Sequence, residues 1–279
     1  MIDAALVLDG ASEPDQHRLT AGGGHVLAYT CRAPDKETEN EDTVAVIPYG
    51  PAAAVLIVAD GAGGLPAGKR ASLTAVNSLV ESMQHAMAET MLLRTAILNG
   101  IEAANSAVQA IGNGSATTLT VITVEGLIVR AYQVGDSEAI VVGQRGVIKL
   151  QTTPHSPTGF AVEAGFLDEK EALHHEDRHL VSNFLGTAEM RIDVCGEVKL
   201  RPRDTILLAS DGLMDNVHLD EIIERVRKGP LDSAAERVIS LAHRRMAGVS
   251  AALPSKPDDL SLILYRKSAN DAPVSSQEI

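Results

Sequence analysis

The stretch AAVLIVADGAGG, residues 53–64, decides the fold class of this chain. Its apolar, partly β-branched run ends in Asp60 and Gly61, which is typical of a strand that leads into a tight turn. From Arg70 to Ile111, apolar residues recur every three or four positions, so two amphipathic helices are expected directly after this strand. A helix pair between strands argues against a doubly wound parallel sheet, which has one helix per strand.

The rest of the chain continues this alternation of strand runs and paired helices. A hairpin is expected over residues 117–135, turning at Glu125 and Gly126. Two further helices are predicted at residues 220–228 and 234–246, followed by a last strand, LSLILY. The residues alone therefore predict an α+β layered domain with antiparallel sheets.

Changes in composition suggest the boundaries of this domain. We expect residues 1–24 to be a lead-in that ends in three glycines, and residues 25–266 to form one domain. Residues 151–190 contain no long apolar run, so they are expected to form a helical excursion over the surface. The small and polar residues 267–279 are expected to be a disordered tail.

The composition limits the classes of partner. The chain has 24 Lys and Arg against 37 Asp and Glu, a net charge of −13, which would repel a nucleic acid. Its two cysteines, Cys31 and Cys195, cannot form a disulfide framework and suit a reducing compartment. Acidic residues stand where a secretory leader would be basic, and the longest apolar run is shorter than the ~20 residues of a membrane span. We expect a cytoplasmic monomer.

Acidic residues recur where the expected strands begin or end. Each of them alone is typical of a turn, but carboxylates that meet at one edge of a sandwich repel each other unless cations intervene. Ligands that are all oxygen favour Mg²⁺ or Mn²⁺, and a pair of such ions can activate a water for in-line attack at phosphorus. The strand-end acids are Glu41, Asp42, Asp60, Asp136, Asp211 and Asp258.

Six motifs resemble the metal-dependent protein phosphatases of type 2C, in their bacterial single-domain form, and they run in the family's order from about residue 25 to 265. The resemblance implies a four-layer αββα sandwich, in which helix pairs flank two antiparallel β-sheets. It also implies a binuclear Mg²⁺ or Mn²⁺ site between the sheets. The motifs are VADGAGG (58–64), GLPAGKRAS (64–72), GSATTL (114–119), VGDSEA (134–139), LASDGLMD (208–215) and DDLSLIL (258–264).

The resemblance assigns the metal ligands by position. Asp60 would bridge both ions, the carbonyl of Gly61 would bind one of them, and Asp211 and Asp258 would bind the other. Catalysis is expected to depend on Asp60 and Asp211. The implied reaction is hydrolysis of phosphoserine and phosphothreonine in proteins by a water or hydroxide that bridges the two ions, without a covalent phosphoenzyme. The implied partner is a phosphoprotein made by an opposing serine/threonine kinase.

Further positions match the family's supporting elements. Glu41 and Asp42 match an acidic pair that supports the site directly or through metal-bound water, and Asp136 would help to hold a third, weaker ion. Residues 151–190 match the family's flap, in which His155 is expected to be an exposed loop residue.

Two positions depart from the family's pattern. Glu37 stands where many members carry an Arg that binds the substrate phosphate, so Arg32 or Lys36 would have to replace it. Ala62 stands where eukaryotic members carry a His that is a candidate general acid, so metal-bound water would protonate the leaving group.

Three rival functions fit the sequence less well. Residues 63–69 spell the GxxxxGK of a nucleotide-binding loop, but Arg70 replaces the Ser or Thr that binds Mg²⁺. Residues 175–179 spell the HExxH of zinc proteases, but in a charged segment with only Glu189 as a conceivable third ligand. A catalytically silent, phosphoprotein-binding pseudophosphatase would be expected to have lost several of the metal-facing acids.

Overall fold

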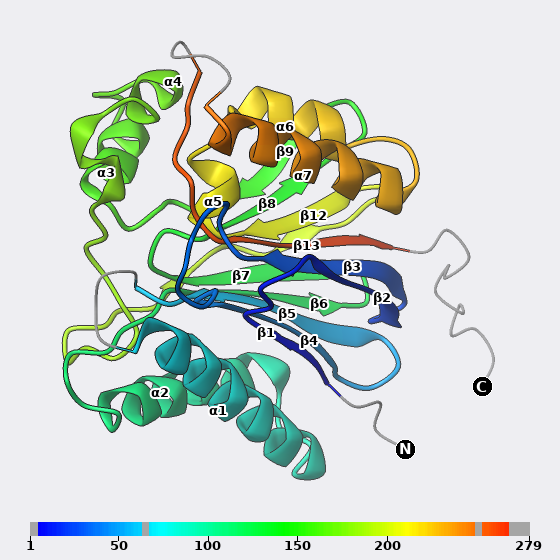
Figure 1. Ribbon diagram of the computed structural model, residues 1–279. Coiled ribbons are helices and arrows are strands. Elements are labelled where there is room, and N and C mark those ends of the chain that lie inside the picture. Colours follow the sequence, from blue (N-terminus) through cyan, green and yellow to red (C-terminus); the bar gives the residue numbers. More distant parts are fainter. Residues whose placement is uncertain (1–4, 63–66, 249–252, 268–279) are drawn as a thin grey trace.

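Two antiparallel β-sheets lie face to face, and helices cover the outer face of each (Figure 1). The computed structural model describes residues 5–62, 67–248 and 253–267. The predicted α+β class and the four-layer αββα sandwich are confirmed. No helix within the described ranges is both long and apolar enough to cross a membrane.

The first sheet contains the strand that decided the fold class, β5. Its strands lie in the order β1-β4-β5-β6-β7-β10, and β11 also pairs with β7. Helices α1 (Gly68–Ala88) and α2 (Leu93–Gln109) cover its outer face, at the bottom of Figure 1. The strands are β1 (Leu6–Asp9), β4 (Asp42–Pro48), β5 (Ala53–Asp60), β6 (Leu119–Glu125), β7 (Ile128–Val134), β10 (Asp193–Val194) and β11 (Val198–Lys199).

The second sheet has the order β2-β3-β13-β12-β8-β9. Helices α6 (Leu219–Val226) and α7 (Leu231–Met246) cover its outer face, and the short helix α5 (Asp211–Met214) directly follows β12. The strands are β2 (Asp15–Ala21), β3 (Gly24–Cys31), β8 (Glu138–Val142), β9 (Ile148–Gln151), β12 (Thr205–Ala209) and β13 (Leu260–Lys267).

Strand β5 shows why the central strands are apolar without interruption. Successive side chains of a strand point to opposite faces of the sheet. Val55 and Ile57 pack against α1 and α2, whereas Leu56 and Val58 pack between the two sheets. Both faces of the strand are buried, so every position is apolar until Asp60.

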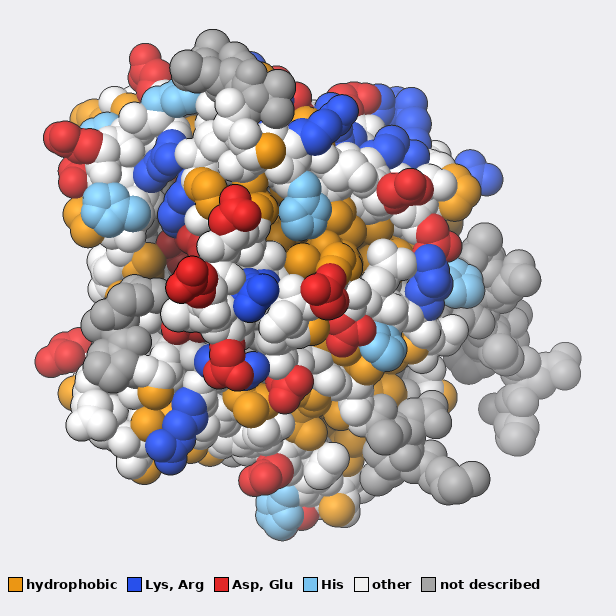
Figure 2. Space-filling view, in the orientation of Figure 1, with side chains coloured by type: hydrophobic (Ala, Val, Ile, Leu, Met, Phe, Trp, Pro, Cys, Tyr) orange, Lys and Arg blue, Asp and Glu red, His pale blue; other side chains and the backbone are white. Residues whose placement is uncertain are grey.

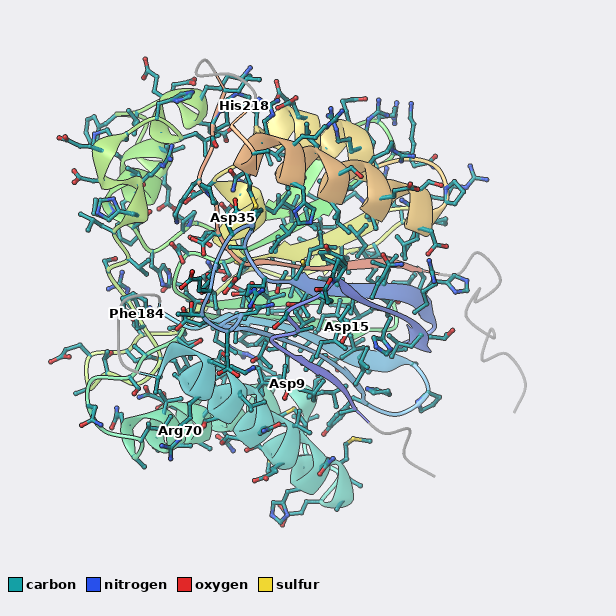
Figure 3. The ribbon with its side chains drawn as sticks, viewed as in Figure 1. Asp9, Asp15, Asp35, Arg70, Phe184 and His218 are labelled. Carbon is teal, nitrogen blue, oxygen red and sulfur yellow. The ribbon has the colours of Figure 1, made fainter. Side chains whose placement is uncertain are left out.

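The N-terminal boundary was predicted wrongly. Residues within the expected lead-in form β1, which pairs with β4, and β2, which pairs with β3. Figure 3 labels Asp9 in β1 and Asp15 at the start of β2. Strand β2 carries an alternating and largely exposed pattern, as expected of a strand at the edge of its sheet. Of the expected tail, Lys267 ends β13, and residues 268–279 lie outside the described residues.

The segment expected to be a helical excursion contains three short helices beside the second sheet (Figure 1). These are α3 (Pro157–Glu163), α4 (Glu169–Ala172) and the 3-10 helix η1 (Glu176–His179). Ser156 caps α3 by accepting a hydrogen bond from the amide of Gly159, 2.9 Å away. Residues 151–190 are called the flap below.

His155 is buried, which corrects the expectation of an exposed loop histidine. Its Nδ1 accepts hydrogen bonds from the Gly135 amide, at 3.1 Å, and from Nδ2 of Asn183, at 2.8 Å. Its Nε2 lies 3.0 Å from a carboxylate oxygen of Asp193. Burial lowers the pKa of His155, and its neutral ring fixes the turn before Asp136 to the base of the flap.

The replacement His155→Gln should reduce the pH dependence of stability. Because the pKa of His155 is lowered in the folded state, the unfolded chain binds the proton first, so the wild type loses stability as pH falls below about 6.5. Between about pH 7.5 and about pH 5.5, the wild type should therefore lose more free energy of unfolding than the variant. Urea denaturation at both pH values measures this difference. The control His25→Gln, at an exposed position, should keep the wild-type dependence, and an equal dependence in all three proteins would refute the assignment.

Candidate metal centre

The strand ends that carry the predicted acids meet at one cavity of about 690 Å³, which all of these acids except the buried Asp42 line. The first sheet contributes Asp60, at the end of β5, and the second contributes Asp211 and Asp258, beside β12 and β13. Asp136 lies in the connection between β7 and β8, which joins the two sheets. Glu41 also lines the cavity, and so do Asp35 and Phe184, labelled on the left of the sandwich in Figure 3.

Asp42 and Asp60 are brought together by strand register. They are directly opposed residues in the antiparallel pair β4 and β5. Asp42 is only 1% exposed, and its Oδ2 accepts a hydrogen bond from Oγ of Ser210 at 2.9 Å. Its Oδ1 has no hydrogen-bond partner among the described residues. A buried carboxylate oxygen without a partner is costly unless a cation binds it.

The backbone of Asp60 is held by the motif GSATTL. The Asp60 amide donates to Oγ1 of Thr118, at 3.0 Å, and its carbonyl accepts from the Thr118 amide and from Oγ1 of Thr117, both at 2.8 Å. Oγ1 of Thr118 also lies 2.9 Å from Oγ of Ser137, which follows Asp136. One buried network of hydroxyl groups therefore fixes the two acidic turns relative to each other.

Three glycines allow the close approaches that this arrangement requires. A Cβ atom on Gly61 would lie 2.3 Å from the carbonyl oxygen of Gly68, at the start of α1. A Cβ atom on Gly68 would lie 2.5 Å from Oε1 of Glu41 and 3.2 Å from the carbonyl carbon of Gly61. On Gly212, it would lie 1.9 Å from the carbonyl oxygen of Asp259. In the turns Asp60-Gly61 and Asp211-Gly212, the glycine therefore packs directly against another backbone segment.

The carboxylates raise each other's pKa values. Burial, followed by repulsion from neighbouring acids, raises the pKa of Asp60 and of Asp136 well above the ordinary range. Burial and the neighbouring Asp211 raise the pKa of Asp258 to about 7 and that of Asp215 to about 6. The apo protein must therefore bind protons or cations at this cluster near neutral pH.

The carboxylate of Asp259 is held by two backbone amides and a lysine, which the sequence did not predict. Its Oδ1 accepts from the Ala33 amide and its Oδ2 from the Glu41 amide, both at 2.8 Å. The Lys36 ammonium lies 2.6 Å from the same Oδ2 and 3.1 Å from Oε2 of Glu41. Lys36 supplies the charge that offsets this acid.

A second lysine, Lys256, also lines the cavity. Nζ of Lys256 lies 2.5 Å from Oδ2 of Asp211, 2.9 Å from Oδ2 of Asp215 and 3.4 Å from Oδ2 of Asp258. The side chain of Lys256 is 22% exposed, so this ammonium group is partly withdrawn from water. Neither Lys256 nor Asp215 was singled out in the sequence, because only their contacts reveal their role.

The donor set fits a divalent cation. Every candidate ligand is an oxygen, and the buried Oδ1 atoms of Asp42 and Asp211 have no partner among the described residues. Within these same residues, no group of three or more Asp, Glu, His or Cys side chains already stands in a chelating arrangement. Lys256 lies among three of the carboxylates instead.

The remaining sequence predictions have different outcomes. Lys36 lines the cavity, whereas the guanidinium of Arg32 points to the Thr38 carbonyl, 3.5 Å away, so phosphate binding by either residue stays a prediction. In the HExxH segment, His175 precedes a short, exposed 3-10 helix and therefore does not share an α-helical face with His179. Of the GxxxxGK segment, residues 63–66 lie outside the described residues.

Comparisons with known proteins agree with this geometry. The profile of the family Protein phosphatase 2C matches residues 33–249. The serine/threonine phosphatase stp of Listeria monocytogenes is 29% identical over 219 residues, which cover 73% of this chain and 84% of that protein.

Two solved structures of bacterial phosphatases share the fold. The serine/threonine phosphatase PstP/Ppp of Mycobacterium tuberculosis superposes with a TM-score of 0.70 at 27% identity, covering 86% of this chain and 97% of its own. The catalytic domain of PstP in complex with two manganese ions gives a TM-score of 0.68 at 26% identity, over 86% of this chain and 96% of its own. The matched profile, the shared fold and the converging acids show that this chain belongs to the protein phosphatase 2C family and is a protein phosphatase.

Proposed function

We propose that this protein hydrolyses phosphoserine and phosphothreonine in proteins, with two Mg²⁺ or Mn²⁺ ions bound in the acidic cavity. The observation that carries the proposal is the convergence of Asp60, Asp211 and Asp258 from both sheets on one cavity. The relative that was solved with two manganese ions supports the choice of metal.

We assign each ligand by its position. Asp60 would contact both ions, and the Gly61 carbonyl would bind one of them. Asp211 and Asp258 would hold the second ion, Glu41 and Asp42 would support the site, and Asp136 would help to hold a third, weaker ion. When bound, the ions supply positive charge and an activated water for attack on phosphorus.

The chain's own residues orient this site and give the substrate little positive charge. The threonines of GSATTL hold the Asp60 backbone, and Ser210 holds the Asp42 carboxylate by a hydrogen bond. On the face drawn in Figure 2, acidic side chains are interspersed with basic ones. Of the two basic residues predicted to bind the substrate phosphate, Lys36 lines the cavity, and Arg32 is the alternative.

The substrate would be a phosphoprotein made by a serine/threonine kinase. A cytoplasmic location and a monomeric state remain predictions. A pseudophosphatase would bind phosphoproteins without turning them over, and undetectable turnover at saturating Mn²⁺ would favour that function.

The replacements Asp60→Asn and Asp211→Asn test the metal site. Each removes one charged ligand, so Mn²⁺-dependent turnover of a phosphothreonine peptide should fall by at least about 100-fold. The matched control Asp9→Asn changes an exposed acid of β1 by the same single atom and should retain wild-type turnover. Wild-type rates in both cavity variants would refute the assignment.

The reaction should proceed without a covalent intermediate. Turnover of a ³²P-labelled phosphoprotein, quenched in acid during the steady state, should leave no label on the enzyme. The reason is that direct attack by water transfers the phosphoryl group to solvent in one step. Stoichiometric label on the denatured enzyme would overturn this mechanism.

A further inference from the structure

Lys256 lies where a cation is needed in the acidic cavity. Its ammonium group is within 3.4 Å of carboxylate oxygens of Asp211, Asp215 and Asp258. Two of these three acids, Asp211 and Asp258, are the ligands proposed for the second ion. The single positive charge of the lysine therefore offsets part of the negative charge of these three acids.

The backbone of Lys256 is fixed by a buried asparagine. The Lys256 amide donates to Oδ1 of Asn216 at 2.7 Å, and its carbonyl accepts from Nδ2 of the same side chain at 2.8 Å. Asn216 is fully buried, and its Nδ2 also donates to the carbonyl of Gly212, next to Asp211. One side chain therefore joins Lys256 to the turn that carries Asp211.

The flap contacts the same segment. Nη2 of Arg178, in η1, donates to the Ser255 carbonyl at 3.1 Å, one residue before Lys256. The position of the lysine is thus fixed by contacts from Asn216, two residues after α5, and from the flap, and it does not depend on the ammonium group alone.

The acids of the first sheet lack such a counter-charge. Within the described residues, no Lys or Arg side chain forms an ion pair with Asp42 or Asp60. Oδ1 of Asp42 also has no hydrogen-bond partner there. The two halves of the cluster therefore differ. The second-sheet half contains the Lys256 ammonium group, and Asp42 and Asp60 have no such partner among the described residues.

We infer that Lys256 is a tethered cation that holds the second-sheet half of the site together without metal and competes with the second divalent ion for Asp211 and Asp258. Binding of that ion requires the ammonium group to leave these carboxylates, because like charges at this separation repel. The other ion, proposed at Asp60 and the Gly61 carbonyl, binds without this penalty. Binding of two Mn²⁺ ions should consequently occur in a tight step and a weak step.

Calorimetric titration of metal-free protein with Mn²⁺ tests this inference. The wild type should show the two steps, and Lys256→Met, which keeps the aliphatic chain but removes the charge, should tighten the weak step by at least about tenfold and leave the tight step unchanged. The matched control Lys170→Met removes the same charge from an exposed ion pair with Asp220, so it should give the wild-type isotherm. An unchanged or weakened second step in Lys256→Met would overturn the inference.

A second readout uses the wild type alone, in case Lys256→Met does not fold without metal. Acylation of lysines followed by mass spectrometry should find Lys256 protected in EDTA and reactive at saturating Mn²⁺, and equal labelling in both states would overturn the inference. Neither readout involves a substrate. An inactive protein that showed both effects would therefore refute the proposed function and leave this inference standing.

Discussion

Repulsion among carboxylates is the constraint on which the rest of this structure depends. Two unit charges about 4 Å apart repel by about 4 kcal/mol at the effective dielectric constant of a protein surface. A hydrogen bond to a charged group, such as that from Ser210 to Asp42, contributes only about 1.5–3 kcal/mol. Hydroxyl groups can therefore orient the acids, but they cannot offset their charge. Only protons, lysines or metal ions can offset it. The raised pKa values favour protonation, Lys36 and Lys256 supply ammonium groups, and the proposed ions would supply the remaining positive charge.

The acids that repel each other come from both sheets. Asp42 and Asp60 belong to one sheet and Asp211 and Asp258 to the other, so separation of the sheets would relieve the repulsion. The apolar residues packed between the sheets, such as Leu56 and Val58, oppose that separation. A core of aliphatic side chains thus holds together acids that would otherwise move apart. Ligands preorganised in this way need little rearrangement when a cation binds.

Much of the fold could be predicted from the sequence, because continuous apolar runs and helical periodicity are local signals. The unbroken run of β5 and the spacing from Arg70 to Ile111 predicted strand and helices correctly. Strand β2 escaped notice because an edge strand is largely exposed and lacks an apolar run. His155 was misplaced because its burial depends on Gly135, Asn183 and Asp193, which are distant in the sequence.

The acids of the site were found by a different kind of signal. Asp60, Asp136 and Asp211 each stand beside a glycine after an apolar run, and this pattern can be recognised in the sequence. Lys256, Asp215 and Asn216 carry no such mark, since their importance lies in contacts across about 40 residues of chain. In the sequence alone, a lysine near an acid looks the same whether the ion pair is exposed or lies in a cavity. Only the folded arrangement shows which cation belongs to which carboxylate.

The pairing of Asp42 with Asp60 across β4 and β5 sets a limit on how this protein can vary. A single residue inserted within either strand would reverse every side chain beyond it, moving one acid to the helix-covered face and the next apolar residue into the cavity. The loop between the strands, residues 49–52, lies at their far end and can change length without moving either acid. Insertions and deletions in this part of the molecule should therefore be confined to the tip of the hairpin, even though the chemistry is at its base.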